Sequence, residues 1–273
     1  MIKPDNPIFV HSDIGRGLLI AKRAKVKLNG SNIFSSLLDF LTSHIDEGDN
    51  RIFFPAFNYD FGKTGVFNVN SDPSQVGVMS EWVRLNCDYK RSEIPFYSIL
   101  SKYEQSLITE GTINPFGNNS IFHKLVSQDA NIVLFGTDIS SLTFIHYIEE
   151  IVGKPIYRYE KIFPGKIVRG NSSSQFCNIS MHVRPLGVHM DYNWPKLERE
   201  LLASGIMKVA NYSSDFKSIS ARRLLEFWGN KIANDPFYLL DEKSTAYFDN
   251  VTSNGLNRVK LEDFENERVE VYK

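Results

Sequence analysis

Residues 131–150 read NIVLFGTDISSLTFIHYIEE, and they determine the fold class that we expect for this chain. Asn131–Phe135 is short and almost entirely apolar, which is typical of a strand buried on both faces. Residues 136–138 interrupt this run, and Ser140 or Ser141 can then cap a helix, because a hydroxyl accepts hydrogen bonds from the free amides of a first turn. A buried strand, a turn and a helix in this order predict an α/β protein.

The predicted helix has two chemically different faces. Helical spacing puts an apolar stripe on the side that should face the core, formed by Phe144, Ile145, Ile148, Ile151 and Val152. The opposite side carries Thr143, His146, Glu149 and Glu150, three and four residues apart and therefore within reach of one another. A carboxylate beside an imidazole raises its pKa and fixes its tautomer, as a general base requires. The alternative is an ordinary solvated face, and the helix alone favours that alternative.

Further strands and helices alternate along the first half of the chain. Pro7–Val10 and Arg51–Phe57 predict buried strands, and Pro55 marks a bulge or the end of the second one. Phe96–Leu100 predicts another short strand. Helices are predicted from Ser31 to about Ile45, from about Val76 to Asn86 and from Ser120, with a loop over 58–69. We therefore expect a mixed, largely parallel central sheet flanked by helices, with functional groups at the carboxyl ends of its strands.

The second half of the chain has a different pattern. Ile156–Val168 and Gln175–Pro185 predict two strands of an antiparallel hairpin around a turn at 170–174. Helices are predicted over Pro195–Ser204 and about Ser218–Asn234, and the polar tail after Asp241 has no clear pattern. We expect one domain over 1–273, with 155–215 as a hairpin-containing subdomain.

Two short segments near the amino terminus allow more than one role. Gly15-Arg16-Gly17 predicts a flexible turn that is too short for a dinucleotide fingerprint. Ala21–Lys27 is basic, and its alternating cations are most often a solvated edge strand, because lysine discourages edge pairing. The functional alternative is a binding site for phosphates.

Composition excludes several classes of protein. The formal net charge of −1 lacks the excess of basic residues that is typical of nucleic-acid-binding proteins. No segment predicts a secretion signal or a membrane span. Two cysteines argue against a disulfide framework. Cys177, His182, His189 and Asp191 lack the spacing of a metal site, and there is neither a GxSxG elbow nor a P-loop. We expect a cytoplasmic enzyme or binding protein without a metal.

Several short motifs occur together in a recognisable order. They are His11-Ser12-Asp13-Ile14, Phe54-Pro55-Ala56-Phe57, Asp72-Pro73-Ser74-Gln75-Val76-Gly77 with Glu81, Arg91-Ser92 with Pro95 and Ser98, Pro115-Phe116-Gly117 with Ser120, Phe135-Gly136 with Thr143, His146 and Glu149, and Ser204-Gly205 before a helix through Arg223. In this order and spacing the chain resembles the aminoglycoside 3-N-acetyltransferase family over nearly its whole length.

The resemblance implies an acyl-CoA-dependent N-acyltransferase that transfers the acyl group directly, without a cysteine intermediate. It implies His146 as general base, held by Glu149 or Glu81, with Thr143 or a helix amide as the oxyanion donor. Residues assigned to acyl-CoA are His11, Ser12, Asp13, Ile14, Gly15, Ser98 and Ser120, with the pyrophosphate near the turn at 11–17. Residues assigned to the acceptor are Arg91, Phe57 and Tyr97.

The acceptor is where the chain departs from the antibiotic-modifying members of the family. Those members commonly have histidines near the Arg-Ser motif, where this chain has Glu93-Ile94-Pro95-Phe96-Tyr97. Aminoglycosides are polycations that suit an acidic cleft, whereas this chain is nearly neutral. We therefore predict a nucleotide-linked amino sugar, such as a dTDP-3-amino-3,6-dideoxyhexose, acylated with acetyl or 3-hydroxybutanoyl for surface polysaccharide (lipopolysaccharide O-antigen) synthesis. The alternatives are aminoglycoside resistance and a noncatalytic CoA- or nucleotide-sugar-binding module, and a homodimer is compatible with the sequence.

Overall fold

The computed structural model describes residues 2–30, 32–44, 51–102, 112–153, 155–170, 173–253 and 257–265. Its main sheet has seven strands in the order β10-β11-β7-β1-β2-β5-β4. The centre is parallel and consists of β7 (Asn131–Phe135), β1 (Ile8–Ser12) and β2 (Ile52–Pro55). The buried strands predicted in these three segments are confirmed, and β2 ends at Pro55.

The outer strands of this sheet are antiparallel. They are β5 (Ile99–Ser101) and β4 (Lys90–Arg91) at one edge, and β11 (Ser213–Ser220) and β10 (Met207–Ala210) at the other. The sheet is therefore mixed, as predicted, but parallel pairing is confined to its three central strands. The strands β10 and β11 were not predicted from the sequence.

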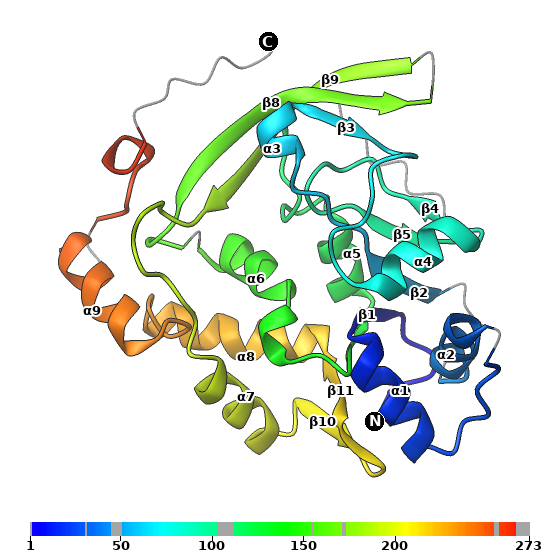
Figure 1. Ribbon diagram of the computed structural model, residues 1–273. Helices are drawn as coiled ribbons and strands as arrows, with labels where there is room; N and C mark the ends of the chain where they lie inside the picture. The colour runs from blue at the N-terminus through cyan, green and yellow to red at the C-terminus, as the bar shows by residue number, and fades with distance from the viewer. Residues whose placement is uncertain are drawn as a thin grey trace.

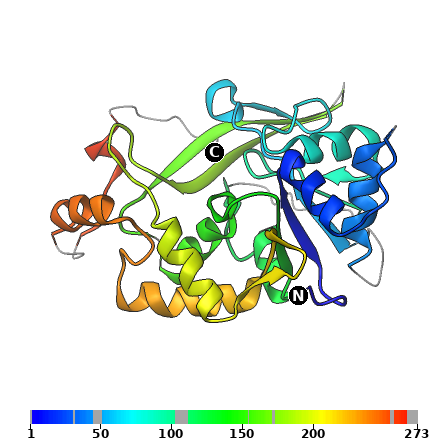
Figure 2. The same ribbon diagram turned by 60° about the horizontal axis from the view of Figure 1, so that its bottom comes forward.

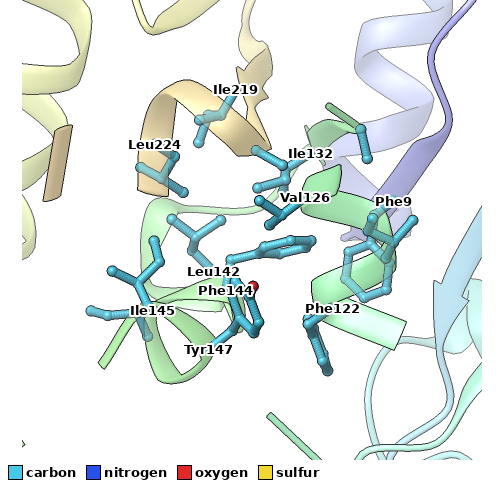
Figure 3. Packing of buried hydrophobic residues seen from close by; sticks show 14 of the residues in the cluster. Phe9, Phe122, Val126, Ile132, Leu142, Phe144, Ile145, Tyr147, Ile219 and Leu224 are labelled. Atoms are coloured by element: carbon cyan, nitrogen blue, oxygen red, sulfur yellow. The ribbon is translucent and has the colours of Figure 1, made fainter. Parts of the chain in front are cut away.

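Helices cover both faces of the sheet, and alternation along β1 separates two cores. Ile8 and Val10 point into a core with α1 (Ile14–Arg23), α2 (Ile33–Thr42) and α4 (Val78–Asn86). Phe9 points into the other core, which α5 (Ile121–Ser127), α6 (Phe144–Val152), α7 (Trp194–Ala203) and α8 (Ala221–Asn234) cover. Figure 1 shows the first set of helices on one side of the sheet and α7 and α8 on the other. Figure 3 shows Phe144 of α6 packed with Phe9 and Phe122.

A second sheet of four strands lies across the carboxyl end of the first. Its order is β3-β8-β9-β6, and its long pair is the antiparallel hairpin of β8 (Tyr159–Arg169) and β9 (Ser173–Val183). The short strands β3 (Val66–Asn68) and β6 (Thr112–Ile113) extend it. The predicted hairpin is confirmed, and Figures 1 and 2 show it lying over α6. This second layer closes the space in which the candidate site lies.

Two predictions near the amino terminus are wrong. Gly15–Gly17 is part of α1, because Asp13 caps that helix by accepting from the Arg16 amide at 2.9 Å. Gly17 allows α1 to lie against β7, since a Cβ there would be only 2.6 Å from Cε1 of Phe135. The basic segment Ala21–Lys27 is no edge strand: its first residues end α1, and Lys25 has a left-handed φ of 58°.

Other local expectations also change. Ser140 and Ser141 belong to a 3₁₀ turn (Ile139–Ser141), and α6 begins after Thr143 without a side-chain cap. The predicted loop over 58–69 contains α3 (Phe61–Thr64) and β3, and the tail contains α9 (Glu242–Val251) and the 3₁₀ turn Leu261–Asp263. Ser31 and Ile45 lie outside the described residues, and Asn32 caps α2. None of the described helices is long and apolar enough to span a membrane.

Candidate active site

A cavity of about 830 Å³ lies between the carboxyl ends of the central strands, α6 and the β8–β9 hairpin. His11 and Ser12 line it from the end of β1, and Phe57 lines it just after β2. Strands that run parallel bring their carboxyl ends to one edge of a sheet, which explains why residues distant in sequence meet here. A cavity of this size is in the range of small-molecule sites.

His146 lies in the wall of this cavity on the first turns of α6. Its Nδ1 is 3.2 Å from Oε2 of Glu149, and its ring packs against Phe116 and Tyr97 with centroids 5.7 and 6.4 Å apart. The side chain is 26% exposed, against 3% for Glu149. The ring therefore borders the cavity while its carboxylate partner lies behind it.

Glu149 is the centre of a buried polar network. Its Oε1 accepts hydrogen bonds of 2.7 Å from the hydroxyls of Tyr157 and Tyr192. Its Oε2 is shared by His146 and the Arg158 guanidinium, whose Nε is 3.3 Å away. Burial on its own raises the pKa of Glu149, but Arg158, His146 and Tyr157 together lower that pKa to about 2. Glu149 is therefore ionised in the folded protein at neutral pH.

The same network sets the protonation state of His146. Burial lowers the pKa of His146, the hydrogen bond to Glu149 raises it, and the charge of Arg158 lowers it, with a net shift downward. The ring is therefore neutral at pH 7. An ionised carboxylate can only accept, so Nδ1 carries the proton and Nε2 keeps its lone pair. A neutral imidazole held in this tautomer can take a proton from a substrate.

Glu81 does not contact His146. Both of its oxygens accept hydrogen bonds from Arg84, at 2.6 and 2.8 Å, and Oε2 also accepts from the Ser74 amide. The hydrogen bond from Arg84 lowers the pKa of Glu81. The structure thus pairs His146 with Glu149 and leaves Glu81 in an ion pair on α4. Thr143 lines the cavity, and its hydroxyl donates a long 3.5 Å bond to the Ser141 carbonyl.

The residues predicted to bind acyl-CoA separate into two groups. His11 and Ser12 line the cavity. Asp13, Ile14 and Gly15 are not among its lining residues; Asp13 caps α1, and Ile14 packs against the first core. His11 is 5% exposed, its Nε2 has no hydrogen-bond partner in the described part of the chain, and burial lowers its pKa to about 3.

Ser98, Ser120 and Arg91 lie away from the cavity wall. Ser98 is fully buried, accepts from Nε of Arg91 at 2.8 Å and donates to the carbonyl of Ala56. Arg91 also donates to the carbonyls of Ala56 and Asp72, so this group ties the end of β2 to its neighbouring loops. Ser120 caps α5 and lines a separate cavity of about 250 Å³. Phe57 and Tyr97, by contrast, line the main cavity as the acceptor prediction requires.

Three residues of this network, Tyr157, Arg158 and Tyr192, were not predicted from the sequence, and His182 was considered only as a metal ligand. Tyr192 and His182 line the cavity, and His182 pairs with Glu150 at 2.7 Å. These partners come from the segment just before β8, from β9 and from the segment before α7, so no local spacing relates them to α6. The described residues contain no group of three or more potential metal ligands.

Comparisons with known proteins bear on this geometry. The sequence model of the family described as aminoglycoside 3-N-acetyltransferase matches residues 56–232. A comparison with curated protein sequences gave no match. Among solved structures, AAC-IIIb in its binary complex with CoASH is similar with a TM-score of 0.65 and 16% identity, covering 85% of this chain and 91% of that one.

Two further solved structures have the same fold. A mutant of aminoglycoside acetyltransferase AAC(3)-IVa in complex with a gentamicin has a TM-score of 0.65 and 15% identity, over 90% of this chain and 88% of that one. The YokD protein from Bacillus subtilis has a TM-score of 0.59 and 17% identity, over 86% and 89% of the two chains. At these identities the likeness establishes the fold, and the predicted α/β class is confirmed.

Proposed function

Because the chain belongs to the aminoglycoside 3-N-acetyltransferase family, we propose that it transfers an acetyl group from acetyl-CoA to an amine of an amino sugar, with His146 as general base. The observation that carries this proposal is the pair of His146 and buried, ionised Glu149 in the wall of an 830 Å³ cavity. Family membership supports CoA-dependent N-acetylation. The roles of individual residues rest on the geometry.

The proposed reaction is a direct transfer. The neutral acceptor amine attacks the thioester carbonyl, and Nε2 of His146 takes the proton that the nitrogen loses as the C–N bond forms. The C–S bond then breaks, and the imidazolium returns the proton to the departing CoA thiolate. Glu149 stays ionised and stabilises the imidazolium, and base assistance of this kind typically contributes ~100- to ~10,000-fold in rate.

Acetyl-CoA is assigned to the end of the cavity at β1 and β7. Small hydroxyl side chains are concentrated there, from Ser12, Ser80, Thr137, Ser140, Ser141 and Thr143. Such a lining suits the amide groups of a pantetheine arm. The first turn of α1 lies next to Ser12. Asp13 already accepts from the Arg16 amide, so the first two amides of the helix are those left for a phosphate. Thr143 is our candidate donor to the thioester oxygen, because it lies in the wall three residues before His146.

An aminoglycoside is the first candidate for the acceptor. The family description and the antibiotic-bound relative support it, since a gentamicin is named with AAC(3)-IVa. The prediction of a nucleotide-linked amino sugar has no such support from the comparisons. Tyr59, Tyr97 and Trp194 supply aromatic surface on which either sugar can stack.

One observation keeps the nucleotide-linked amino sugar as a second candidate. Among the described lining residues the carboxylate is that of Asp191 alone, whereas Arg158 and Arg184 are cationic. Arg184 is exposed, and Arg158 is engaged with Glu149. A polycationic antibiotic would gain little from such a lining, while a diphosphate would gain a partner in Arg184.

A turnover assay tests both the acetyl transfer with His146 as base and the class of the acceptor. Release of CoA thiol from acetyl-CoA is measured with a panel of aminoglycosides and of nucleotide-linked amino sugars. We expect turnover with at least one panel, and His146→Asn should abolish it while preserving the affinity for CoA measured by calorimetry. His123→Asn is the matched control, because His123 is exposed on α5 and does not line the cavity. Full activity of His146→Asn would overturn the assignment of the base, and turnover of one panel alone selects the acceptor class.

A further inference from the structure

Two tyrosines donate to the same carboxylate oxygen from different positions. Tyr157 and Tyr192 both bond Oε1 of Glu149 at 2.7 Å. Tyr157 is fully buried against Phe237 and Phe248 and does not line the cavity. Tyr192 lines the cavity, and its hydroxyl is also 3.5 Å from Nδ1 of His146. The two hydroxyls share one acceptor but have different surroundings, so the effects of removing each can be compared directly.

Arg158 distinguishes the two tyrosines further. Its Nη2 donates a 2.6 Å bond to the Tyr192 hydroxyl, and its Nη1 reaches the His182 carbonyl at 3.5 Å. Its Nε approaches Oε2 of Glu149 to 3.3 Å but forms no aligned hydrogen bond with any described residue. The guanidinium is therefore close to Glu149 without engaging it in the two-pronged geometry that arginine and carboxylate prefer.

Contacts with neighbouring residues hold Tyr192 in position. Tyr192 forms an isolated bridge with Leu240, and the next residue donates its amide to the Leu239 carbonyl at 2.9 Å. The ring packs at 5.0 Å from Trp194. Because the backbone is held at these points, the hydroxyl stays between Arg158 and Glu149.

From this arrangement we propose that Tyr192 is a positioning residue of the base: by holding Nη2 of Arg158, its hydroxyl keeps the guanidinium from capturing the Glu149 carboxylate and leaves Oε2 to His146. The inference rests on the proposed role of His146. The titratable groups around His146 and its partner are Glu149 itself, Tyr97 before β5 and Tyr192 before α7, with Arg158 and Tyr157 before β8 against Glu149. Of these, Glu149 and Arg158 are charged at neutral pH, and Tyr192 contacts both.

Removal of each hydroxyl should therefore have a different effect. In Tyr192→Phe, Nη2 of Arg158 loses its partner and can turn onto Glu149 as a bidentate pair, which draws Oε2 away from His146. The imidazole then loses the hydrogen bond that raises its pKa, so its pKa should fall and kcat should drop ~10-fold, a modest part of the assistance that an oriented base gives. In Tyr157→Phe, Glu149 loses one donor and Arg158 is undisturbed. The carboxylate then interacts more strongly with His146, whose pKa should rise or stay unchanged.

The test measures the pKa of His146 by NMR of ¹⁵N-labelled imidazole, together with kcat, in both variants. Tyr147→Phe is the control, since Tyr147 is a buried neighbour on α6 whose hydroxyl bonds His123 at 2.9 Å, outside this network. Thermal unfolding of each variant checks the fold. The expected result is a lower His146 pKa and a lower kcat in Tyr192→Phe, no fall of the His146 pKa in Tyr157→Phe, and no change of either quantity in Tyr147→Phe.

Equal effects of the two tyrosine variants, or no effect of Tyr192→Phe on the imidazole, would overturn the proposal. A loss confined to the acceptor KM would also overturn it, because Tyr192 would then be part of the binding wall. In an Arg158→Lys background, where no bidentate pair can form, Tyr192→Phe should lose most of its effect. The NMR arm needs no turnover, so absence of acetylation by the wild-type protein would reject the proposed function while this inference is still tested.

Discussion

Replacement of Glu149 by glutamine removes the negative charge that balances Arg158 inside the protein. Glu149 is 3% exposed and Arg158 is 9% exposed, so neither charge can turn to solvent. The amide keeps the size of the side chain and can still accept from Tyr157 and Tyr192. The amide nitrogen takes the place of Oε2, so Glu149→Gln removes the charge that balances Arg158 and also the acceptor for Nδ1 of His146.

The size of the effect follows from the pKa of Glu149. The ordinary value of 4.5 is lowered to about 2 by Arg158, His146 and Tyr157 against the opposing effect of burial. At 1.36 kcal/mol per pKa unit, this difference corresponds to about 3 kcal/mol of folding free energy. Removal of one partner of a buried ion pair costs about 3–5 kcal/mol by comparison with other proteins. We therefore expect Glu149→Gln to lower the free energy of unfolding by about 3 kcal/mol at pH 7.

The pH dependence has a definite sign. A carboxylate whose pKa is depressed in the folded state stabilises the protein above the unfolded-state pKa and loses that effect as pH falls through the folded-state pKa. The stability gap between wild type and Glu149→Gln should thus be constant above about pH 5 and narrow by about 2 kcal/mol at pH 3. Urea unfolding followed by circular dichroism at pH 7, 5, 4 and 3 measures the gap. Glu81→Gln is the control, and its partly exposed ion pair with Arg84 should contribute less than about 1 kcal/mol. A gap that does not change with pH would show that ionised Glu149 does not contribute this stability.

Three further variants test other parts of the structure. His11→Phe should raise the KM for acetyl-CoA about tenfold, the equivalent of one hydrogen bond, without changing the acceptor KM, whereas equal changes in both would contradict a CoA-side position for His11. Gly17→Ala should lower the free energy of unfolding by about 1–3 kcal/mol, because its Cβ would overlap the Phe135 ring; thermal or urea unfolding that matches wild type would show that the ring can move aside. Ser98→Ala should cost about 1–3 kcal/mol by leaving Arg91 short of a buried partner, and an increased KM for acetyl-CoA at unchanged stability would instead restore the CoA assignment of Ser98.

The parts of the fold that were predictable depend on patterns within one element. A five-residue apolar run predicted β7, a proline marked the end of β2, and two strand-like segments around a polar turn predicted the β8–β9 hairpin. The prediction of an edge strand at 21–27 was wrong because alternating charges indicate only that a segment is exposed, and the end of a helix is exposed just as an edge strand is. Local pattern cannot separate the two.

The predicted helix face shows why the site could be predicted only in part. Spacing placed His146 and Glu149 together correctly, and their 3.2 Å contact confirms that proximity. The same spacing put Glu149 on a solvated face, yet its side chain is only 3% exposed. A helical wheel assumes one buried side, whereas α6 is covered by the sheet on one side and by the segment around Tyr157 and Arg158 on the other. The partners on that second side come from distant parts of the sequence, so they are recognisable only in three dimensions.

Residues packed against α6 also explain why only one imidazole is free to act as a base, although Glu149 and Glu150 of α6 each pair with a histidine. Glu150, next to Glu149, accepts from Nδ1 of His182 at 2.7 Å, and His182 also lines the cavity. The Nε2 of His182, however, lies 3.2 Å from Nη1 of Arg258, a group that can only donate. Both nitrogens of His182 are thus engaged, one as donor and one as acceptor, and its lone pair is occupied by the arginine. His146 has its lone pair on Nε2, for which the described residues provide no partner, so the arrangement of cations around two similar pairs selects which imidazole can accept a proton from a substrate.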